Sequence, residues 1–188
     1  EKHRTVESAL NTLSGKVDFV KCKECGFVFN QLFEQLSYEV EYEAGRSSSD
    51  VFNQYLSEIV SNLTHAIDNN IYRVVEIGAG NCEFAMNYIA NRNIDYIAID
   101  TSWHKTRLPE VKGVKCVAGS YRNEMKLKPD MLVLRHVLEH ISKVRGFMSS
   151  ILFEKPQYVF IEIPCYEFVR NNNYHLFSYE HCSYFTKQ

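Results

Sequence analysis

The sequence predicts an α/β domain built on a doubly wound, mostly parallel β-sheet. Short runs of apolar and β-branched residues alternate with longer segments of helical or mixed pattern. Strands that are apolar along their whole length are typical of parallel sheets covered on both faces, and parallel strands need connections long enough for a helix. The expected strands are residues 72–77, 95–99, 114–118, 131–134 and 158–163, with helix-length connections at 82–90 and 137–152.

The residues before the first expected strand divide into a helix and an appendage. Residues 50–67 place apolar side chains at helical spacing, and Ser49 or Asp50 can cap the start of that helix. The preceding residues have mixed polarity and run into a Gly-Arg-Ser-Ser-Ser stretch that is typical of a linker. We therefore expect an N-terminal appendage at residues 1–48 and the main domain at residues 49–188.

Composition excludes several classes of protein. The 188 residues are 45% apolar and 23% charged, which suits a packed core and excludes a disordered or fibrous chain. The net charge of −2 is spread without a basic patch, so we expect no nucleic-acid partner and no membrane surface as partner. No apolar run approaches the roughly 20 residues of a membrane-spanning helix. We expect a soluble, cytoplasmic protein whose isolated cysteines are reduced thiols.

A glycine-rich turn after the first expected strand indicates a ligand site. Gly78 and Gly80 allow a tight turn and a close backbone approach, and the helix that follows Asn81 presents free N–H groups. A dinucleotide fingerprint would carry a third glycine where Glu83 stands, which disfavours a nicotinamide-dependent dehydrogenase. Glu76 adds negative charge at the same strand end, so a cationic ligand is favoured over a phosphate.

An acidic residue, one apolar residue and Gly-x-Gly at the end of a strand resemble motif I of the class I S-adenosylmethionine-dependent methyltransferases. Asp100 ends the next strand 20 residues after Gly80, where a carboxylate can accept hydrogen bonds from both ribose hydroxyls. The segment from Leu134 to Ile141 resembles the family's H-x-L-E-H pattern after the fourth strand. The resemblance implies a Rossmann-like methyltransferase domain at residues 49–188, with these cofactor-binding residues: Glu76, Gly78, Gly80, Asn81, Asp100, Ser120, Tyr121, Arg135 and His136.

The last part of the chain resembles a narrower group, the sugar C-methyltransferases that act on nucleotide-linked keto-deoxysugars. The resemblance rests on the Glu-Ile-Pro end of the fifth strand and on the Glu-His-Cys-Ser-Tyr-Phe-Thr segment at residues 180–186. It implies a role in sugar biosynthesis, with His181 as the catalytic base and Glu180, Tyr179 or Tyr184 orienting it or binding the enolate oxygen. This group carries a tyrosine where the chain has Ser178, which is a departure from its pattern.

Two other functions stay open on the same fold. An O- or N-methyltransferase for another small metabolite would use His181 or His136 as its base. A catalytically silent methyltransferase-like module would bind a partner and transfer nothing. Neither the acceptor atom nor the oligomeric state follows from the sequence.

Cys22 and Cys25 resemble one knuckle of the small zinc domain that precedes the methyltransferase domain in the sugar enzymes. Two thiolates make half of a tetrahedral zinc site, and His3 is a poor third ligand. We expect zinc to be bound only in a longer protein with a second pair of ligands upstream, or the site to have decayed. The family's sheet closes with a hairpin after the Ser-Tyr-Phe-Thr segment, so we also expect a chain truncated before the last strands.

Overall fold

A computed structural model describes residues 5–11, 15–33, 49–67, 70–104, 107–167, 171, 177 and 180–186. The chain forms two compact units, one of Glu1–Ser37 with Pro164–Gln188 and one of Tyr38–Ile163. The larger unit holds a parallel sheet, and the smaller unit holds a short antiparallel one.

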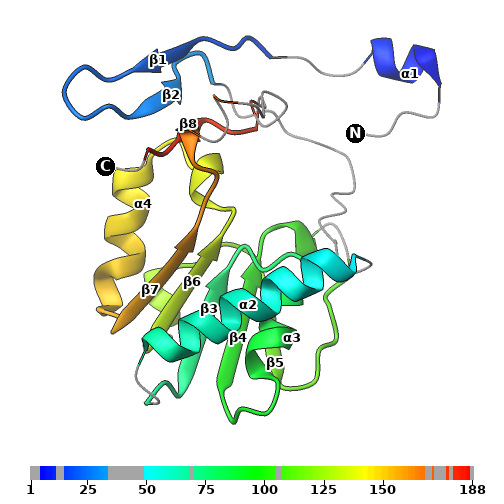
Figure 1. The fold of residues 1–188 in the computed structure, drawn as a ribbon, viewed down its shortest axis with the longest axis vertical. Coiled ribbons are helices and arrows are strands. Elements are labelled where there is room, and N and C mark those ends of the chain that lie inside the picture. The colour runs from blue at the N-terminus through cyan, green and yellow to red at the C-terminus, as the bar shows by residue number, and fades with distance from the viewer. Residues whose placement is uncertain are drawn as a thin grey trace. The chain divides into compact units, whose positions relative to one another are not determined.

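The parallel sheet confirms the fold class that the sequence predicts. Its five strands have the order β5-β4-β3-β6-β7, and every neighbouring pair is parallel (Figure 1). Chain order reverses at β3, with β4 on one side and β6 on the other. Ligands of open α/β sheets bind at such a switch point, beyond the carboxyl ends of the strands. The strands are β3 (Arg73–Ile77), β4 (Asp95–Asp100), β5 (Val114–Ala118), β6 (Met131–Arg135) and β7 (Tyr158–Glu162).

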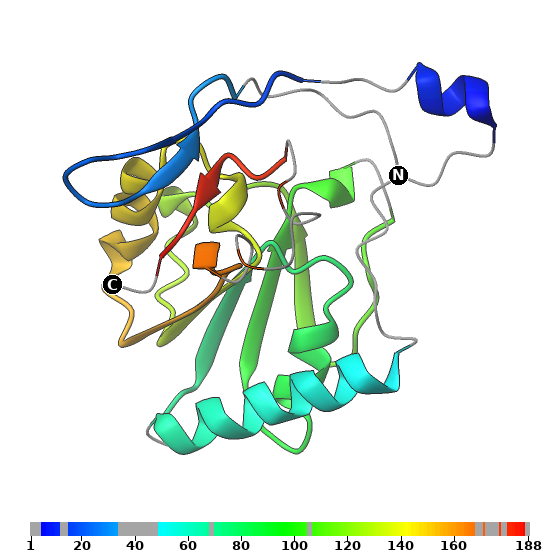
Figure 2. The same ribbon diagram turned by 45° about the horizontal axis from the view of Figure 1, so that its top comes forward.

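Both faces of the sheet are covered. Val74 and Val75 are neighbours in β3 and are both fully buried, although consecutive side chains of a strand point to opposite faces. On one face, α2 (Asp50–Ala66) and α3 (Glu83–Ile89) lie side by side (Figures 1 and 2). The Ser49 hydroxyl accepts a hydrogen bond from the Phe52 amide and caps α2, as expected from the sequence. Among the described residues, no helix is both long and apolar enough to cross a bilayer.

The connection from β6 to β7 differs from the expected helix over residues 137–152. It opens with a 3-10 turn, η3 (Leu138–His140), and α4 (Val144–Ile151) begins only later. His136 has a left-handed backbone with φ of 53°, and its amide donates to the Glu162 carbonyl at 2.8 Å. A residue in this conformation cannot continue into an α-helix, so the chain turns sharply as it leaves β6.

The smaller unit joins segments from both ends of the chain. Its sheet has the order β1-β2-β8, formed by β1 (Phe19–Lys21), β2 (Val28–Asn30) and β8 (Ser183–Tyr184). Tyr184 and Val28 are buried in its core, with Phe19 packed against them. A short helix, α1 (Val6–Leu10), precedes this sheet in the chain. The compact unit therefore combines the residues from Pro164 onward with the N-terminal segment, and the division expected at residue 48 stays a prediction.

Candidate active site

The glycine-rich turn after β3 has the backbone that its glycines allow. Gly78 and Gly80 have φ of 75° and 53°, a region that other residues rarely adopt. The Gly78 amide donates to the Ile99 carbonyl at 2.8 Å, which joins the turn to the end of β4. A Cβ atom on Gly78 would lie 2.5 Å from Cγ2 of Val137, so the turn also packs directly against the segment that follows β6. The turn therefore lies at the switch point of the sheet.

Asp100 connects this turn to the segment after β4. Its Oδ2 accepts a hydrogen bond from the Gly80 amide at 2.8 Å. Its Oδ1 accepts from the amide and the hydroxyl of Ser102, at 2.8 and 2.6 Å. Each carboxylate oxygen has two lone pairs, so Asp100 retains capacity to accept from a ligand hydroxyl. The predicted ribose-binding carboxylate thus lies beside the glycine-rich turn, with its orientation set by protein donors.

Glu76 is buried in β3, two residues before Gly78 of the turn. Its side chain is 2% exposed, and Oε2 accepts a hydrogen bond from the Tyr96 hydroxyl at 2.8 Å. Burial raises the pKa of Glu76 to about 7, although the Tyr96 hydrogen bond and the charge of Arg135 act in the opposite direction. A cation bound nearby would favour the ionised carboxylate, which fits the predicted cationic ligand.

The end of β5 carries the next pair of predicted cofactor residues. The Gly119 amide donates to the Asp100 carbonyl at 2.9 Å, so the chain after β5 runs beside the end of β4. Ser120 is exposed there, and Tyr121 is 9% exposed. Burial raises the pKa of Tyr121 to about 12, so its phenol stays protonated at neutral pH. Asn81 is also exposed, at the glycine-rich turn.

Charged side chains contact one another at the carboxyl ends of β6 and β7. Nε of Arg135 lies 2.5 Å from Oε2 of Glu162, and the two side chains are 9% and 13% exposed. Oε1 of Glu162 accepts from the Tyr55 hydroxyl at 2.5 Å and lies 3.3 Å from Nε2 of His136. Burial acts to raise the pKa of Glu162, but hydrogen bonds from His136, Arg135 and Tyr55 outweigh it and hold this pKa at about 2. Glu162 is therefore a carboxylate with several donors around it.

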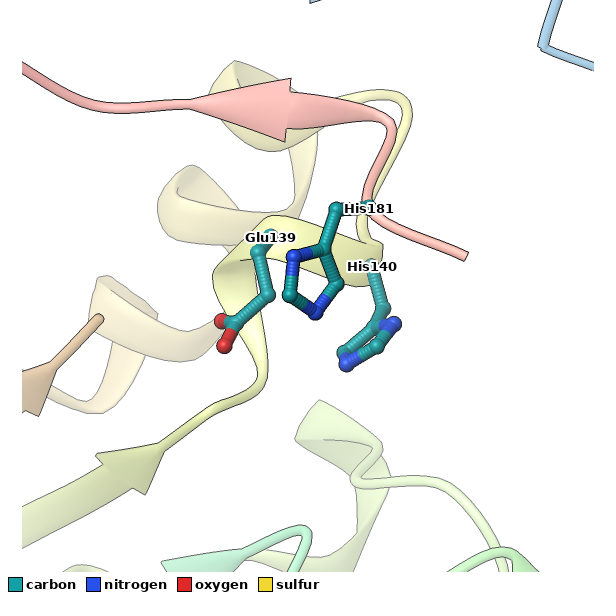
Figure 3. A group of neighbouring side chains, drawn as sticks. All are labelled: Glu139, His140 and His181. Carbon is teal, nitrogen blue, oxygen red and sulfur yellow. The ribbon is translucent and has the colours of Figure 1, made fainter. Parts of the chain in front are cut away.

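His136 is held between two carboxylates. Its Nδ1 lies 3.2 Å from Oε1 of Glu139, a buried residue of η3 shown in Figure 3. Hydrogen bonds to Glu139 and Glu162 raise the pKa of His136 to about 9 against the opposing effect of burial. The ring is thus an imidazolium at neutral pH with both nitrogens engaged. This geometry disfavours the alternative in which His136 acts as the base.

Two of the predicted catalytic residues, Glu180 and His181, lie in the smaller unit. His181 precedes β8 (Figure 3) and is partly buried. Its ring is edge-on to that of Tyr184, with a centroid distance of 6.1 Å. Glu180 lies in the turn just before it. Tyr179 lies outside the described residues. The catalytic roles of these three residues stay predictions.

The predicted zinc ligands lie on the hairpin that joins β1 to β2. The Gly26 amide donates to the Cys22 carbonyl at 3.0 Å, and the Cys22 amide donates to the Phe27 carbonyl at 2.8 Å. Hydrogen bonds from the backbone of Cys25 and Glu24 lower the pKa of the Cys22 thiol, which favours a metal-binding thiolate. In the described part of the chain, no group of three or more His, Cys, Asp or Glu ligands includes either cysteine. Two ligands do not complete a zinc site, so no chemical step is assigned to zinc.

Several residues of this site are missing from the sequence-based prediction. Trp103 donates from Nε1 to the Gly80 carbonyl at 2.9 Å, and Tyr55 reaches Glu162 from α2. Ser102 could have been found, since a serine two residues after an aspartate commonly closes a local turn. The contacts of Trp103 and Tyr55 depend on the tertiary fold, and no local pattern marks them.

A family model and one solved structure agree with this architecture. The sequence model of a methyltransferase domain family matches residues 30–188. The methyltransferase domain of the bacterial protein CtHen1 is similar to the chain, with a TM-score of 0.50 and 20% identity over 66% of this chain and 72% of that one. A candidate O-methyltransferase from Nostoc punctiforme has a TM-score of 0.48 and 18% identity, covering 70% of this chain and 43% of that one. No curated protein sequence matches the chain.

Proposed function

The chain belongs to the methyltransferase domain family and is an S-adenosylmethionine-dependent methyltransferase, and from this premise we propose that its acceptor is a small molecule, a nucleotide-linked keto-deoxysugar. The cofactor side of the proposal rests on one observation above all. Asp100 links the Gly80 amide to Ser102 at the carboxyl ends of β3 and β4, beside the switch point of the sheet.

The residues around the glycine-rich turn fit S-adenosylmethionine. Asp100 retains one acceptor position, on Oδ2, for a ribose hydroxyl, and the buried carboxyl of Glu76 suits a ligand that carries positive charge. Ser120 and Tyr121, at the end of β5, would contact the adenine. Asn81 would contribute at the turn itself. When bound, the cofactor supplies a methyl group attached to a positively charged sulfur.

For Arg135 we propose a supporting role in place of direct contact with the cofactor. Its guanidinium pairs with Glu162 and lies over the Phe84 ring at 5.0 Å from the centroid. Its charge acts on the pKa of Glu76 and favours the carboxylate. We propose that Arg135 and His136 belong to a cluster of charged side chains beside the cofactor site. This cluster connects the carboxyl ends of β6 and β7.

The acceptor side of the proposal rests on the sequence pattern. Glu162-Ile163-Pro164 and the segment 180–186 resemble the sugar C-methyltransferases. In that chemistry a base removes a proton from the carbon next to a ketone, and the resulting enolate carbon forms the new C–C bond as the C–S bond breaks. His181 would take the proton, because imidazole ordinarily titrates near neutral pH. Glu180 or Tyr179 would orient His181 or donate to the enolate oxygen.

Proton removal can be tested without methyl transfer. The chain would be incubated in D2O with a nucleotide-linked 4-keto-deoxysugar and S-adenosylhomocysteine, which has no methyl group to transfer. We expect NMR to show that deuterium replaces a hydrogen on the carbon next to the ketone. His181→Gln should slow this exchange by about 10²–10⁴-fold, the usual contribution of a general base.

A matched control uses the exposed His65 near the end of α2, whose Nδ1 lies 2.6 Å from the Ser61 carbonyl oxygen. His65→Gln should leave the exchange unchanged. Methyl transfer to an oxygen or nitrogen of the acceptor, without carbon-bound exchange, would contradict the C-methyl assignment and favour the alternative acceptor class. Binding of S-adenosylmethionine with no transfer to any acceptor would favour the silent module.

A further inference from the structure

Both backbone groups of Gly80 are held by residues that follow β4. The Gly80 amide donates to Oδ2 of Asp100 at 2.8 Å, and the Gly80 carbonyl accepts from Nε1 of Trp103 at 2.9 Å. The amides of Gly78 and Ala79 also donate hydrogen bonds to this part of the chain, both to the Ile99 carbonyl in β4. The peptide groups on either side of Gly80 are therefore fixed by two different side chains.

Trp103 is itself packed in the core of the larger unit. It lies in the 3-10 turn η1 (Ser102–His104), is 5% exposed, and belongs to the same buried cluster as Ala79 and Cys82. Asp100 lies two residues before this turn, and its Oδ1 accepts from the Ser102 amide. One carboxylate thus positions both the amide of Gly80 and the turn that carries the indole.

The Trp103 hydrogen bond also sets the direction of the next amide. In a planar trans peptide, the carbonyl of one residue and the N–H of the following residue point in opposite directions. Because the Gly80 carbonyl points to the indole, the Asn81 N–H points away from it. Among the described residues, no acceptor is hydrogen-bonded to the Asn81 N–H. This amide is a donor that remains available to a ligand at the turn.

We propose that Trp103 is a positioning residue of the cofactor site, whose indole N–H orients the Gly80–Asn81 peptide so that the Asn81 amide donates to bound S-adenosylmethionine. The inference rests on the cofactor site proposed above. Without the indole N–H, this peptide can rotate, and binding must then order it. Trp103 acts through the backbone and does not contact the reacting methyl group.

The chain contains one tryptophan, so biosynthetic replacement with tryptophan analogues changes Trp103 alone. Benzothienylalanine has nearly the same shape but carries sulfur in place of the N–H, and 5-fluorotryptophan retains the N–H as a matched control. We expect the Kd for S-adenosylhomocysteine to rise about fivefold to tenfold with benzothienylalanine, as for the loss of one hydrogen bond. With 5-fluorotryptophan, the Kd should stay at the wild-type value.

A purely structural role is distinguished by two further readouts. Hydrogen exchange of the backbone at residues 78–81 should become faster in the benzothienylalanine protein, and saturating ligand should raise its unfolding temperature less than it does for the control. A structural role alone would lower the unfolding temperature equally with and without ligand. Equal Kd values in the two analogue proteins, with the natural protein binding normally, would overturn the inference alone. Absence of binding to the natural protein would overturn the proposed cofactor site and the inference together.

Discussion

Replacing Gly78 with alanine should destabilise the larger unit by an amount that follows from its geometry. At φ of 75°, an alanine would occupy the left-handed region, which costs about 1–2 kcal/mol. Its Cβ would lie 2.5 Å from Cγ2 of Val137, and relieving such overpacking typically costs about 1–3 kcal/mol. We therefore expect Gly78→Ala to lower the free energy of unfolding by about 2–5 kcal/mol.

Gly146 offers a control with the same chemical change in the same unit. It lies in α4, and a Cβ built there meets nothing within 4 Å. Alanine in an exposed helix position should raise the free energy of unfolding by about 0.5–1 kcal/mol. Urea unfolding followed by circular dichroism measures both variants against the wild type, with equal m-values as the check that the same unit unfolds.

The two substitutions should shift the urea midpoint in opposite directions. An unchanged or higher midpoint for Gly78→Ala would refute the reasoning, because the turn would then tolerate a side chain where the structure leaves no room. A loss of stability in Gly146→Ala comparable to that in Gly78→Ala would show that the effect does not depend on the turn.

Three further predictions concern the ionisable side chains Glu162, His136 and Glu76. Glu162→Ala leaves Arg135 without its buried partner, so urea unfolding should show a loss of about 3–5 kcal/mol, and a loss below about 1 kcal/mol would contradict the pairing. The pKa of His136 is raised from 6.5 to about 9, so its stabilisation is complete below pH 6.5 and is lost as the pH rises through 9. His136→Gln should therefore reduce the decline of the free energy of unfolding with rising pH. An unchanged pH dependence in this variant would count against the two carboxylate contacts. The pKa of Glu76 is about 7, so binding of cationic S-adenosylmethionine should release a proton and weaken below that pH. Calorimetry in buffers of different ionisation enthalpy measures this proton release, and Glu76→Gln should abolish the release. A binding heat of the wild-type chain that is the same in every buffer would contradict the prediction.

The sheet and the glycine-rich turn could be predicted because their signals are local. Each strand is a short apolar run, and the turn is marked by Gly78 and Gly80 within a few residues of the strand end. Asp100 could be predicted as well, since adjacent parallel strands bring their carboxyl ends to one edge of the sheet. The strand pattern, with the resemblance to the methyltransferase motifs, therefore brings Gly80 and Asp100 to the same edge of the sheet, and their contact with the cofactor stays a prediction.

Other features depend on contacts that no local pattern encodes. Tyr55 and Glu162 are 107 positions apart, and their hydrogen bond requires α2 to lie where the whole fold places it. β8 is only two residues long, so no strand-like run in the sequence predicts its pairing with β2. The two carboxylates beside His136 could not be foreseen either, since a single histidine in the sequence says nothing of its neighbours in the fold.

The most direct test of the cofactor site is calorimetric titration of the chain with S-adenosylhomocysteine, using paired substitutions at the two ends of β4. Asp95 and Asp100 begin and end the same strand, and Asp95 pairs with Arg73 at the opposite edge of the sheet. We predict one-site binding that Asp95→Asn leaves unchanged and that Asp100→Asn weakens by about 10- to 150-fold, as for charged hydrogen bonds. Equal affinities in the two variants, or no binding to the wild-type chain, would contradict a cofactor site at Asp100.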